Sequence, residues 1–424
     1  MPAAKSIVIL GGGVIGLSTA YYCARRGHQV TLIDRNPEQR DGCSFGNAGM
    51  ITPSHFVPLA APGMIGTAFK WMWNPESPLY IKPRLNWDLL SWGWKFMRAA
   101  NVRHMERSAP VLRDLSFASA ACFEELAAST NNDFGLVEKG LLMLCLTGPS
   151  LEHEAAFARQ ANQLGVPAEV LDASALARLD PNVTTTVAGG VYFPKDCHLT
   201  PGRFMDSLQR LCEKNGVRFL WETEATSWRT AHTDQLAAVT CRGPNGTFDC
   251  SGDEFVLCAG SWSSPEARAL GLNLPMQAGK GYSLTLTQPR ELPQICAIFT
   301  EARVAVTPMG KTLRFGGTME IAGLNEDINP VRVQGIIKSV SRYYPNFSAR
   351  DFEGVQPWRG LRPCSPDGLP YVGRTEKFRN LSVATGHAMM GLSLGPITGQ
   401  LMSEVLNGEK PSIDIQLLNP DRYA

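Results

Sequence analysis

The length, composition and charge of the chain narrow its class before any motif is considered. It has 424 residues, of which 44% are hydrophobic and 19% charged, and its formal net charge is +1. A chain this long exceeds what one small hydrophobic core supports, so we expect at least two domains. The near-zero charge excludes bulk electrostatic attraction to nucleic acid or to an anionic membrane. No apolar run approaches the roughly 20 residues that a membrane-spanning helix needs.

The eleven cysteines are scattered along the chain and form no C-x-x-C pair. An odd, unpatterned set is typical neither of a disulfide framework nor of a zinc site. We therefore expect no bound metal. A reducing compartment follows from the same argument, so we expect the cytoplasm, with peripheral attachment to the inner face of the membrane as the alternative.

A glycine-rich turn near the N-terminus is the most informative motif. The apolar run 7–10 predicts a buried strand, residues 17–26 predict a helix, and residues 29–33 predict a second strand that stops at Asp34. Between the first strand and the helix lies Gly-Gly-Gly-Val-Ile-Gly at 11–16. This order of strand, glycine turn, helix, strand and acid predicts a dinucleotide-binding site.

Each part of this motif has its own role. Gly11 permits the tight turn, Gly13 lets the backbone approach a pyrophosphate, and Gly16 lets helix and strand pack closely. Asp34 lies 18 residues after Gly16, where it can accept hydrogen bonds from ribose hydroxyls. Arg35 weakens the argument that this acid excludes a 2′-phosphate. The motif alone therefore leaves NAD, NADP and FAD open.

The segment 43–51 is small, polar and punctuated by glycine, apart from its apolar end. Such a stretch can run its backbone along an extended cofactor and donate N–H groups to it. The alternative is a surface loop, although the apolar residues 48–51 fit water poorly.

Tryptophans concentrate in one region, since five of the nine lie between Trp71 and Trp94. Asn86 is a predicted N-cap of a helix over 87–98. One face of this helix carries the apolar residues Trp87, Leu90, Trp94 and Met97. We interpret this face as covering a core. The alternative is a surface that docks on a partner or makes peripheral contact with a membrane, because interfacial helices favour Trp with Lys and Arg.

The remaining elements follow from periodicity and turn signals. Residues 270–355 are expected to alternate between strands and turns. The chain starts and ends with strand, glycine turn and helix, so we expect both ends in one nucleotide-binding domain, with a β-rich domain inserted between them. The other predicted helices are 108–129, 150–164, 201–214 and 397–406, and the other strands are 136–146, 217–221, 254–258 and 381–384.

A set of motifs along nearly the whole chain carries a resemblance to a known family. The chain resembles the D-amino-acid oxidase and dehydrogenase superfamily of FAD enzymes. It is most similar to bacterial D-amino-acid dehydrogenases, with glycine oxidase and sarcosine oxidase as more distant relatives. The matching motifs are the glycine turn at 11–16, Ser44-x-x-Asn47-Ala48-Gly49, residues 60–63 (Ala-Ala-Pro-Gly), 280–283 (Lys-Gly-Tyr-Ser), 360–368 and 385–387 (Thr-Gly-His).

The resemblance implies an α/β fold in which a Rossmann-like FAD-binding domain carries an inserted substrate domain with a mixed β-sheet. It selects FAD over NAD. The expected FAD-binding domain is discontinuous, over 1–65, 150–268 and 356–424. The expected substrate domain covers 66–149 and 269–355.

The same resemblance implies the residues of the site. Arg362 would pair with the substrate carboxylate, and Gly391, Leu392 and Ser393 would lie at the flavin ring. The full set of expected cofactor-binding residues is Gly11, Gly13, Val14, Ile15, Gly16, Asp34, Arg35, Cys43, Ser44, Asn47, Ala48, Gly49, Met50, Ala225, Ala259, Gly260, Trp262, Gly391, Leu392 and Ser393.

Three further residues are candidates for catalysis. The hydroxyl of Tyr282 could reach the substrate carboxylate, and His55 and His387 could contact the amine or the flavin; the alternative for each is a structural role.

The chain departs from the glycine oxidases at Met389, where those enzymes carry a second arginine. An apolar residue there implies room for a larger or cyclic side chain.

The expected reaction is FAD-dependent oxidation of a D-amino acid or of a cyclic imino acid such as a D-proline derivative, with a hydride moving from Cα to flavin N5. The electron acceptor would be oxygen or a quinone. Three alternatives remain: a glycine- or sarcosine-type amine oxidase, a flavoprotein subunit active only within a larger dehydrogenase, and an NAD(P)-dependent dehydrogenase. A hydrolase is excluded, since the G-x-S-x-G pattern at 391–395 has no histidine after it.

Overall fold

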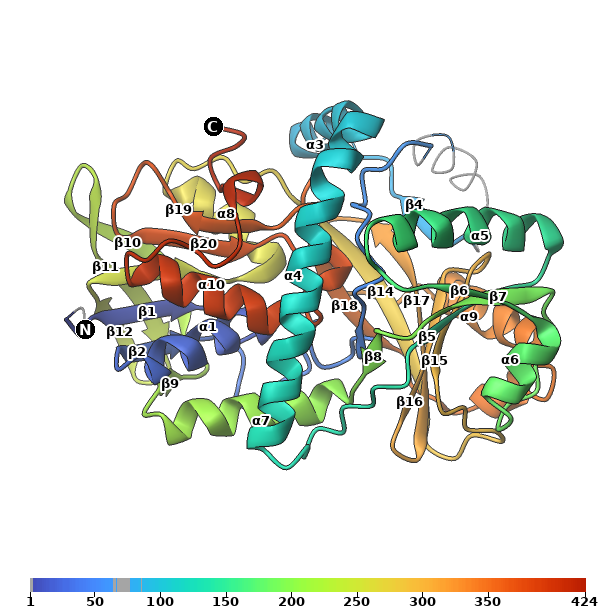
Figure 1. The fold of residues 1–424 in the computed structure, drawn as a ribbon. Coiled ribbons are helices and arrows are strands. Elements are labelled where there is room, and N and C mark those ends of the chain that lie inside the picture. The colour runs from blue at the N-terminus through green and yellow to red at the C-terminus, as the bar shows by residue number, and fades with distance from the viewer. Residues whose placement is uncertain (1–2, 64–65, 67–76, 85) are drawn as a thin grey trace.

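The glycine turn follows β1, an inner strand of a six-stranded sheet (Figure 1). The computed structural model describes residues 3–63, 66, 77–84 and 86–424. β1 pairs in parallel with β2 and β13, and β13 pairs in parallel with β20, so both ends of the chain meet in one sheet as predicted. In sheet order the strands are β19 (Tyr371–Arg374), β20 (Leu381–Thr385), β13 (Glu254–Leu257), β1 (Ser6–Leu10), β2 (Gln29–Ile33) and β9 (Arg218–Leu220).

The apolar run of β1 is continuous because both faces of this sheet are covered. Ile7 and Ile9 belong to a core built with three helices, whereas Val8 and Leu10 face a second core on the other side. The three helices are α1 (Val14–Arg25), α7 (Pro201–Lys214) and α10 (Gly395–Leu406). The opposite face is covered by α8 (Ser263–Ala269) and by the small sheet of β10 (Glu224–His232), β11 (Gln235–Gly243) and β12 (Gly246–Ser251).

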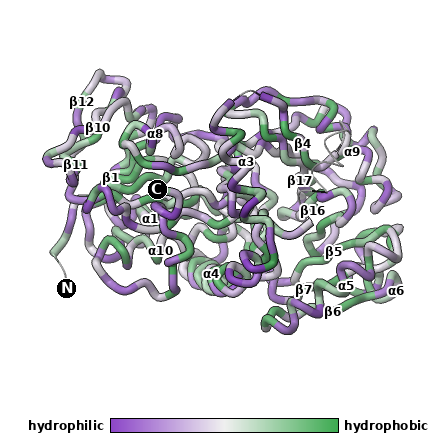
Figure 2. The backbone as a smooth tube through the Cα atoms, turned by 90° about the horizontal axis from the view of Figure 1, so that it is seen from above, coloured by the Kyte–Doolittle hydropathy of each residue, from purple (hydrophilic) through white to green (hydrophobic). Residues whose placement is uncertain are grey.

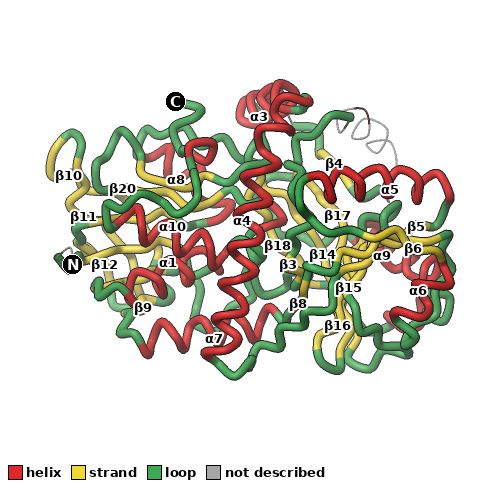
Figure 3. The backbone as a smooth tube through the Cα atoms, viewed as in Figure 1, coloured by secondary structure: helices red, strands yellow, loops and turns green. Residues whose placement is uncertain are grey.

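A second, larger sheet forms the other half of the molecule (Figure 3). Leu141 and Met143 of β5 face the core of the first half, and Leu142 and Leu144 face a separate core under α9 (Pro330–Tyr343). The core of the first half therefore extends to one face of the larger sheet. The order is β18 (Trp358–Cys364), β14 (Gln277–Leu286), β17 (Thr312–Ile321), β16 (Val304–Met309), β15 (Cys296–Phe299), β5 (Leu141–Cys145), β7 (Gly189–Phe193) and β6 (Glu169–Asp172), with β4 (Leu79–Ile81) beside β17.

Strand pairing divides the chain differently from the domain boundaries expected from the sequence. β6 and β7 lie within 150–268, and β18 lies within 356–424, yet all three pair in the larger sheet. In the other direction, α4 (Val102–Ser129) comes from the expected substrate segment but packs on α10. Figure 1 shows α4 crossing between the two halves. β3 (Met50–Ile51) and β8 (Cys197–His198) add a further two-stranded link.

The predicted mixed α/β fold is confirmed, but the long helix α9 was missed. Residues expected to alternate between strands and turns include α9 (Pro330–Tyr343). Its signal is present in the sequence, since the side chain of Asn329 caps the helix and Pro330 occupies its first turn. Of the remaining helices, α3 (Trp87–Ala99) and α5 (Gly148–Gln163) lie close to their predicted ranges, whereas the short α6 (Ala173–Leu179) was not predicted. Among the described residues, we find no helix with the length and apolarity to cross a membrane.

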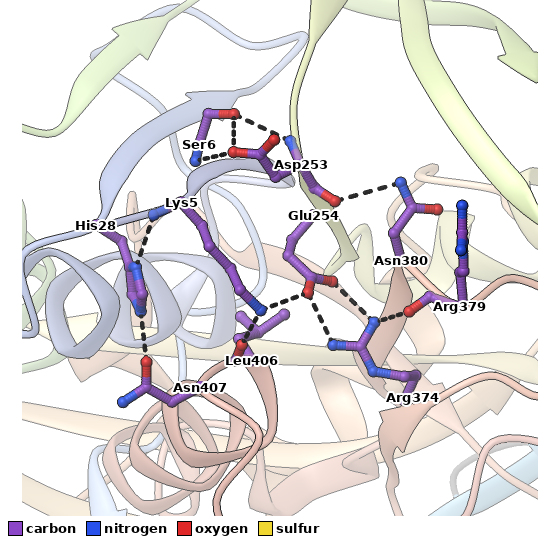
Figure 4. A network of polar contacts seen from close by, with 10 residues as sticks. All are labelled: Lys5, Ser6, His28, Asp253, Glu254, Arg374, Arg379, Asn380, Leu406 and Asn407. Carbon is purple, nitrogen blue, oxygen red and sulfur yellow. Dashed lines mark hydrogen bonds and ion pairs between the residues drawn. The ribbon is translucent and has the colours of Figure 1, made fainter. Parts of the chain in front are cut away.

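A buried carboxylate ties the two ends of the chain to the central strand (Figure 4). Glu254, which is 6% exposed at the start of β13, accepts from Lys5 Nζ at 2.9 Å and from Arg374 Nη1 and Nη2 at 2.8 and 3.0 Å. Lys5 also donates to the carbonyl of Leu406 at the end of α10, at 2.7 Å. Sheet and helix are therefore joined through one ion cluster.

We predict that Glu254→Gln lowers the free energy of unfolding by about 2–3 kcal/mol, measured by urea denaturation. Breaking a fully buried ion pair costs roughly 3–5 kcal/mol, and the effect is smaller here because Lys5 and Arg374 are about one-third exposed. The control is Glu224→Gln, which breaks the exposed pair with Arg242 and should cost about 0–1 kcal/mol. Equal losses in the two variants would contradict the prediction.

Candidate functional site

A cavity of about 410 Å³ lies where the parallel strands of the first sheet end. Leu10 at the end of β1, Ile33 at the end of β2 and Cys258 just after β13 all line it. The crevice outside the carboxyl ends of such strands is the usual ligand site of a doubly wound sheet. The position of the cavity therefore matches the dinucleotide site predicted from the glycine turn.

The three motif glycines are required for different reasons. A Cβ at Gly11 would lie 2.4 Å from the carbonyl oxygen of Cys258, and a Cβ at Gly16 would lie 1.8 Å from the carbonyl oxygen of Gly11. These two positions are closed by protein packing. A Cβ at Gly13 would meet only Ser44 Oγ, at 3.6 Å, so this glycine leaves its space to the cavity. The cradle therefore fits a backbone that a pyrophosphate approaches closely.

Asp34 is fixed at the end of β2 by backbone donors. Its Oδ2 accepts from the N–H of Gly12 at 2.6 Å, and its Oδ1 accepts from the N–H of Asn36 at 2.8 Å. Arg35, the next residue, lies over the ring of Trp262 at 3.9 Å from the ring centroid. Asp34, Arg35 and Trp262 all line the cavity. Carboxylate, guanidinium and indole thus surround the space expected for the adenosine half of the cofactor.

The predicted loop 43–51 is held by a residue that sequence reasoning missed. Arg314 on β17 donates to the carbonyls of Phe45 and Asn47 at 3.1 and 2.8 Å. Burial lowers the pKa of Arg314 to about 10. Ser44, in the same loop, accepts from the N–H of Val14 at 3.1 Å and so caps α1. The loop is therefore held by hydrogen bonds to β17 and to the start of α1, and no local sequence pattern links Arg314 to it.

The structure brings most of the expected cofactor-binding residues to one cavity. Gly16 lies behind the turn, and Ala48, Gly49, Met50 and Ser393 also do not line it. Ser393 instead accepts from the N–H of Thr52 at 3.1 Å. The expected residues that line the cavity are Gly11, Gly13, Val14, Ile15, Asp34, Arg35, Cys43, Ser44, Asn47, Ala225, Ala259, Gly260, Trp262, Gly391 and Leu392, together with His387.

Other lining residues were not identified from the sequence. Arg359 on β18 lines the cavity and lies 3.3 Å from Asp41 and 3.7 Å from Glu326. Thr223 and Glu224 are neighbours of the expected Ala225, so the start of β10 could have been included as a segment. Arg359 and Glu326 come from the second sheet and its loops, and no sequence spacing relates them to the glycine turn.

Arg362 lies on β18 against Gly281 of β14. A Cβ at Gly281 would come within 2.2 Å of Arg362 Nη2, so the missing side chain makes room for the guanidinium. Nη1 donates to the carbonyl of Thr318 at 2.7 Å. Burial raises the pKa of Cys43, which lines the cavity, and the charge of Arg362 partly offsets that rise. No carboxylate in the described parts of the chain pairs with Arg362.

The carbonyl that Arg362 contacts belongs to a strained residue. Thr318 has φ +63°, a left-handed conformation that β-branched residues rarely adopt. The pairing of β14 with β17 is irregular between Lys280 and Tyr282, opposite this residue. Such a conformation costs on the order of 1–3 kcal/mol and typically occurs at functional sites. The bulge turns the carbonyl of Thr318 towards the guanidinium of Arg362.

The hydroxyl of Tyr282 is engaged away from the cavity, which corrects the role considered for it. It donates to Glu320 Oε2 at 2.8 Å and accepts from the N–H of Asn329 at 3.2 Å. Lys280 points the same way and donates to Asn325 and to the carbonyl of Asp327. We therefore leave Tyr282 out of the proposed substrate site, because its side chain packs in the core under α9.

The two candidate histidines meet at a second cavity of about 40 Å³. His55 and His387 both line it, and His387 lines the larger cavity as well, so the two cavities adjoin there. Burial lowers the pKa of His387 to about 3, and its Nε2 lies 3.0 Å from Thr398 Oγ1. Met389 lines the same small cavity.

We predict that Gly13→Ala weakens FAD binding about 10- to 100-fold without changing the thermal stability of the cofactor-free protein. The added methyl group has room in the protein but occupies the cavity, which would cost the close backbone contacts to phosphate. Titration of the cofactor-free protein with FAD measures the affinity. Gly202→Ala, in open space on α7, is the matched control and should bind FAD as the parent does. Unchanged affinity in Gly13→Ala would contradict this placement of the phosphates.

Comparisons with known proteins agree with this geometry. Residues 6–405 match the family described as FAD dependent oxidoreductase, DAO. The chain is 32% identical to a D-amino acid dehydrogenase of Bradyrhizobium diazoefficiens and 31% identical to one of Granulibacter bethesdensis, in both cases over 99% of each chain. A crystal structure of glycine oxidase from Geobacillus kaustophilus has a similar fold, with a TM-score of 0.76 at 22% identity over 99% of each chain. The chain therefore belongs to the DAO family of FAD-dependent oxidoreductases.

Proposed function

We propose that the protein oxidises a D-amino acid or a cyclic imino acid, such as a D-proline derivative, at its Cα–N bond. The observation that carries the proposal is Arg362. The residue is half-buried and has no carboxylate partner among the described residues. Its neighbours Leu361 and Pro363 line the cofactor cavity, although Arg362 itself does not. Leaving a cation without a counter-charge in such a place is costly, and a substrate carboxylate would provide one.

The arginine also suits the geometry of the reaction. A planar guanidinium holds a carboxylate through two parallel hydrogen bonds, which a lysine cannot reproduce. Gly281 and the carbonyl of Thr318 fix the position of this group, so a bound carboxylate would fix the direction of Cα. FAD supplies the chemistry by accepting a hydride from Cα. The resulting imine would then be hydrolysed by water or released as a cyclic imine.

The surroundings of Met389 support a substrate larger than glycine. Met389 is 45% exposed and lines the small cavity with His55 and Met390. The glycine oxidases carry an arginine at the matching position, which would add a charge and reduce the space. The D-amino acid dehydrogenases named above are the relatives from which we take the D configuration.

Anaerobic reduction of the bound flavin tests the proposal. Purified holoenzyme is mixed with D- and L-amino acids, including cyclic and N-methyl members, and the flavin absorbance is followed. We expect bleaching by D-amino or cyclic imino acids. Bleaching by glycine and sarcosine alone would favour the oxidase alternative, and no bleaching by any member would overturn the proposal. Turnover of the isolated chain with an artificial acceptor would exclude the larger-complex alternative.

We predict that Arg362→Lys raises KM about 10- to 100-fold, because one charge-assisted hydrogen bond is lost. Gly281→Ala should raise KM in the same direction, since its Cβ displaces the guanidinium without changing the charge. Steady-state kinetics measure both, with Arg379→Lys on an exposed loop as control. An unchanged KM in both Arg362→Lys and Gly281→Ala would contradict the assignment of the carboxylate site.

An exposed face of α3 favours a second proposal, peripheral binding to a lipid bilayer. The face expected to cover a core is in fact exposed: Trp87 is 81% exposed, Leu90 54%, Trp94 53% and Met97 50%. The core is contacted by the other side of the helix, where the ring N–H of Trp92 donates to the carbonyl of Cys364. Figure 2 shows α3 between the two halves of the molecule. Trp71 and Trp73 lie outside the described residues.

The chemistry of this face fits the interfacial region of a membrane. Arg98 lies over the ring of Trp94 at 4.8 Å from the ring centroid, so cation and indole are presented together. Interfacial helices combine Trp, an apolar stripe and basic residues in this way. A bilayer would also bring a quinone acceptor to the protein, and oxygen remains the alternative acceptor.

We predict that the holoenzyme sediments with vesicles of phosphatidylglycerol and phosphatidylethanolamine, and that Trp87→Ser with Trp94→Ser abolishes this binding. The double variant should keep its flavin and its reduction by substrate, because both side chains face away from the core. Phe248→Ser, which removes an exposed aromatic ring on β12, is the control and should still bind. Equal sedimentation of the parent and the double variant would contradict the proposal.

A further inference from the structure

A buried carboxylate next to the small cavity has no counter-charge in the described structure. Asp196 lies just before β8 and is 1% exposed. Its Oδ1 accepts from the N–H of Ser54 at 3.0 Å, and its Oδ2 accepts from Ser54 Oγ at 2.5 Å. No lysine, arginine or histidine of the described residues forms an ion pair with it. Both of its oxygens are thus directed to one serine, and burying a carboxylate in this way is costly.

The same hydroxyl of Ser54 also contacts a histidine. Its Oγ lies 3.1 Å from Nδ1 of His55. A hydroxyl has one proton to donate, and here it is donated to Asp196. The contact with His55 then requires that Nδ1 carry the proton, which leaves a lone pair on Nε2. An ionised Asp196 therefore selects one tautomer of His55 through Ser54.

Nε2 of His55 is available to a ligand. It has no hydrogen-bond partner among the described residues, and the side chain lines the small cavity beside His387 and Met389. Burial, with a contribution from the charge of Arg303, lowers the pKa of His55 to about 4. The ring is therefore neutral at physiological pH and can accept a hydrogen bond. With so low a pKa, His55 would not hold a proton taken from a substrate amine. Its expected role is therefore to orient the amine by accepting a hydrogen bond.

We propose that Asp196, acting through Ser54, holds His55 in the tautomer whose Nε2 accepts a hydrogen bond from the N–H of the substrate amine. Asp196 and Ser54 are positioning residues, and His55 is the residue that contacts the substrate. The inference rests on the proposed function, in which Arg362 holds the carboxylate of the same substrate. Two separate anchors, a cation for the carboxylate and an acceptor for the amine, would orient Cα towards the cofactor.

The arrangement has a defined dependence on pH. Burial raises the pKa of Asp196 to about 7, although the hydrogen bonds from Ser54 lower it. Below that pH, a protonated Asp196 can donate to Ser54 Oγ, and the hydroxyl of Ser54 then donates to Nδ1 of His55. The ring must place its proton on Nε2, so the acceptor for the amine is lost. Affinity for an N–H donor therefore falls as the pH drops through about 7.

The neighbouring titratable groups do not change charge in this range. Burial holds His387 neutral, with a pKa of about 3, and burial together with the charge of Asp196 keeps the nearby thiols protonated. The charge of Arg303 also acts on His55. The two thiols are those of Cys197 and Cys296.

Two ligands of matched shape test the inference without turnover. Pyrrole-2-carboxylate carries a ring N–H, and furan-2-carboxylate has a ring oxygen in its place. Both are titrated into holoenzyme, and binding is followed by the change in flavin absorbance at pH 5.5 and pH 8. For the parent protein at pH 8, we expect roughly tenfold tighter binding of the pyrrole, the value of one hydrogen bond. At pH 5.5 the preference should disappear.

Variants of Asp196 and Ser54 test whether these residues position His55 or only stabilise the fold. Asp196→Asn and Ser54→Ala should lose the preference at both pH values while still binding furan-2-carboxylate. Asp180→Asn is the matched control, since Asp180 is 3% exposed, accepts from the N–H groups of Gln294 and Ile295, and has a pKa raised by burial. It should retain the preference and its dependence on pH. Thermal unfolding of all three holoenzymes reports any common loss of stability.

The outcomes distinguish the inference from the function on which it rests. A preference that persists in Asp196→Asn and Ser54→Ala, or that does not change between the two pH values, would overturn the inference and leave the proposed function intact. Failure of the parent to bind either carboxylate would count against the proposed function itself.

Discussion

The close approach of Gly11, Gly16 and Cys258 is the constraint on which the site depends. With a Cβ at either glycine, helix α1 and the loop after β13 could not come this near to the end of β1. The contact places a helix N-terminus and the carboxyl ends of three parallel strands around one cavity. A dinucleotide needs this combination of unpaired N–H groups and accessible backbone. Every other part of the site is positioned relative to that turn.

In the second sheet, strand β14 separates polar side chains that are buried in a network from an arginine that has no acidic partner. On one face of β14, Lys280 and Tyr282 are engaged in a buried network with Glu320. On the other face, Gly281 leaves space for Arg362, which lacks an acidic partner in the described structure. Strand β14 therefore engages the charge of Lys280 on one face and leaves room for the guanidinium of Arg362, from β18, on the other. Since the alternation of a strand sends neighbouring residues to opposite faces, a single strand can serve both purposes.

Two side chains of opposite charge, Arg362 and Asp196, have no counter-charge among the described residues. Arg362 stands between Leu361 and Pro363, which line the larger cavity, and Asp196 contacts Ser54, whose hydroxyl lies next to His55 at the smaller one. Low dielectric strengthens the effect of each charge on a bound group. Under the proposed function, an amino acid would complement both groups, which would connect these charges with the chemistry of the family.

The sequence by itself determined the nucleotide half: the glycine turn, Asp34, the loop at 44–47 and the strands that join both chain ends follow from local patterns with few conformational solutions. It also predicted Arg362, through the family resemblance, and His55, from its residue type, as candidates for the substrate site. Only the tertiary structure decided that Tyr282 faces a core, that α3 exposes its Trp face, and that Ser54 and Asp196 stand behind His55. These depend on which face of a strand or helix meets a distant segment, and Asp196 is 142 residues from Ser54. Contacts of that range are set by packing, which a local pattern does not encode.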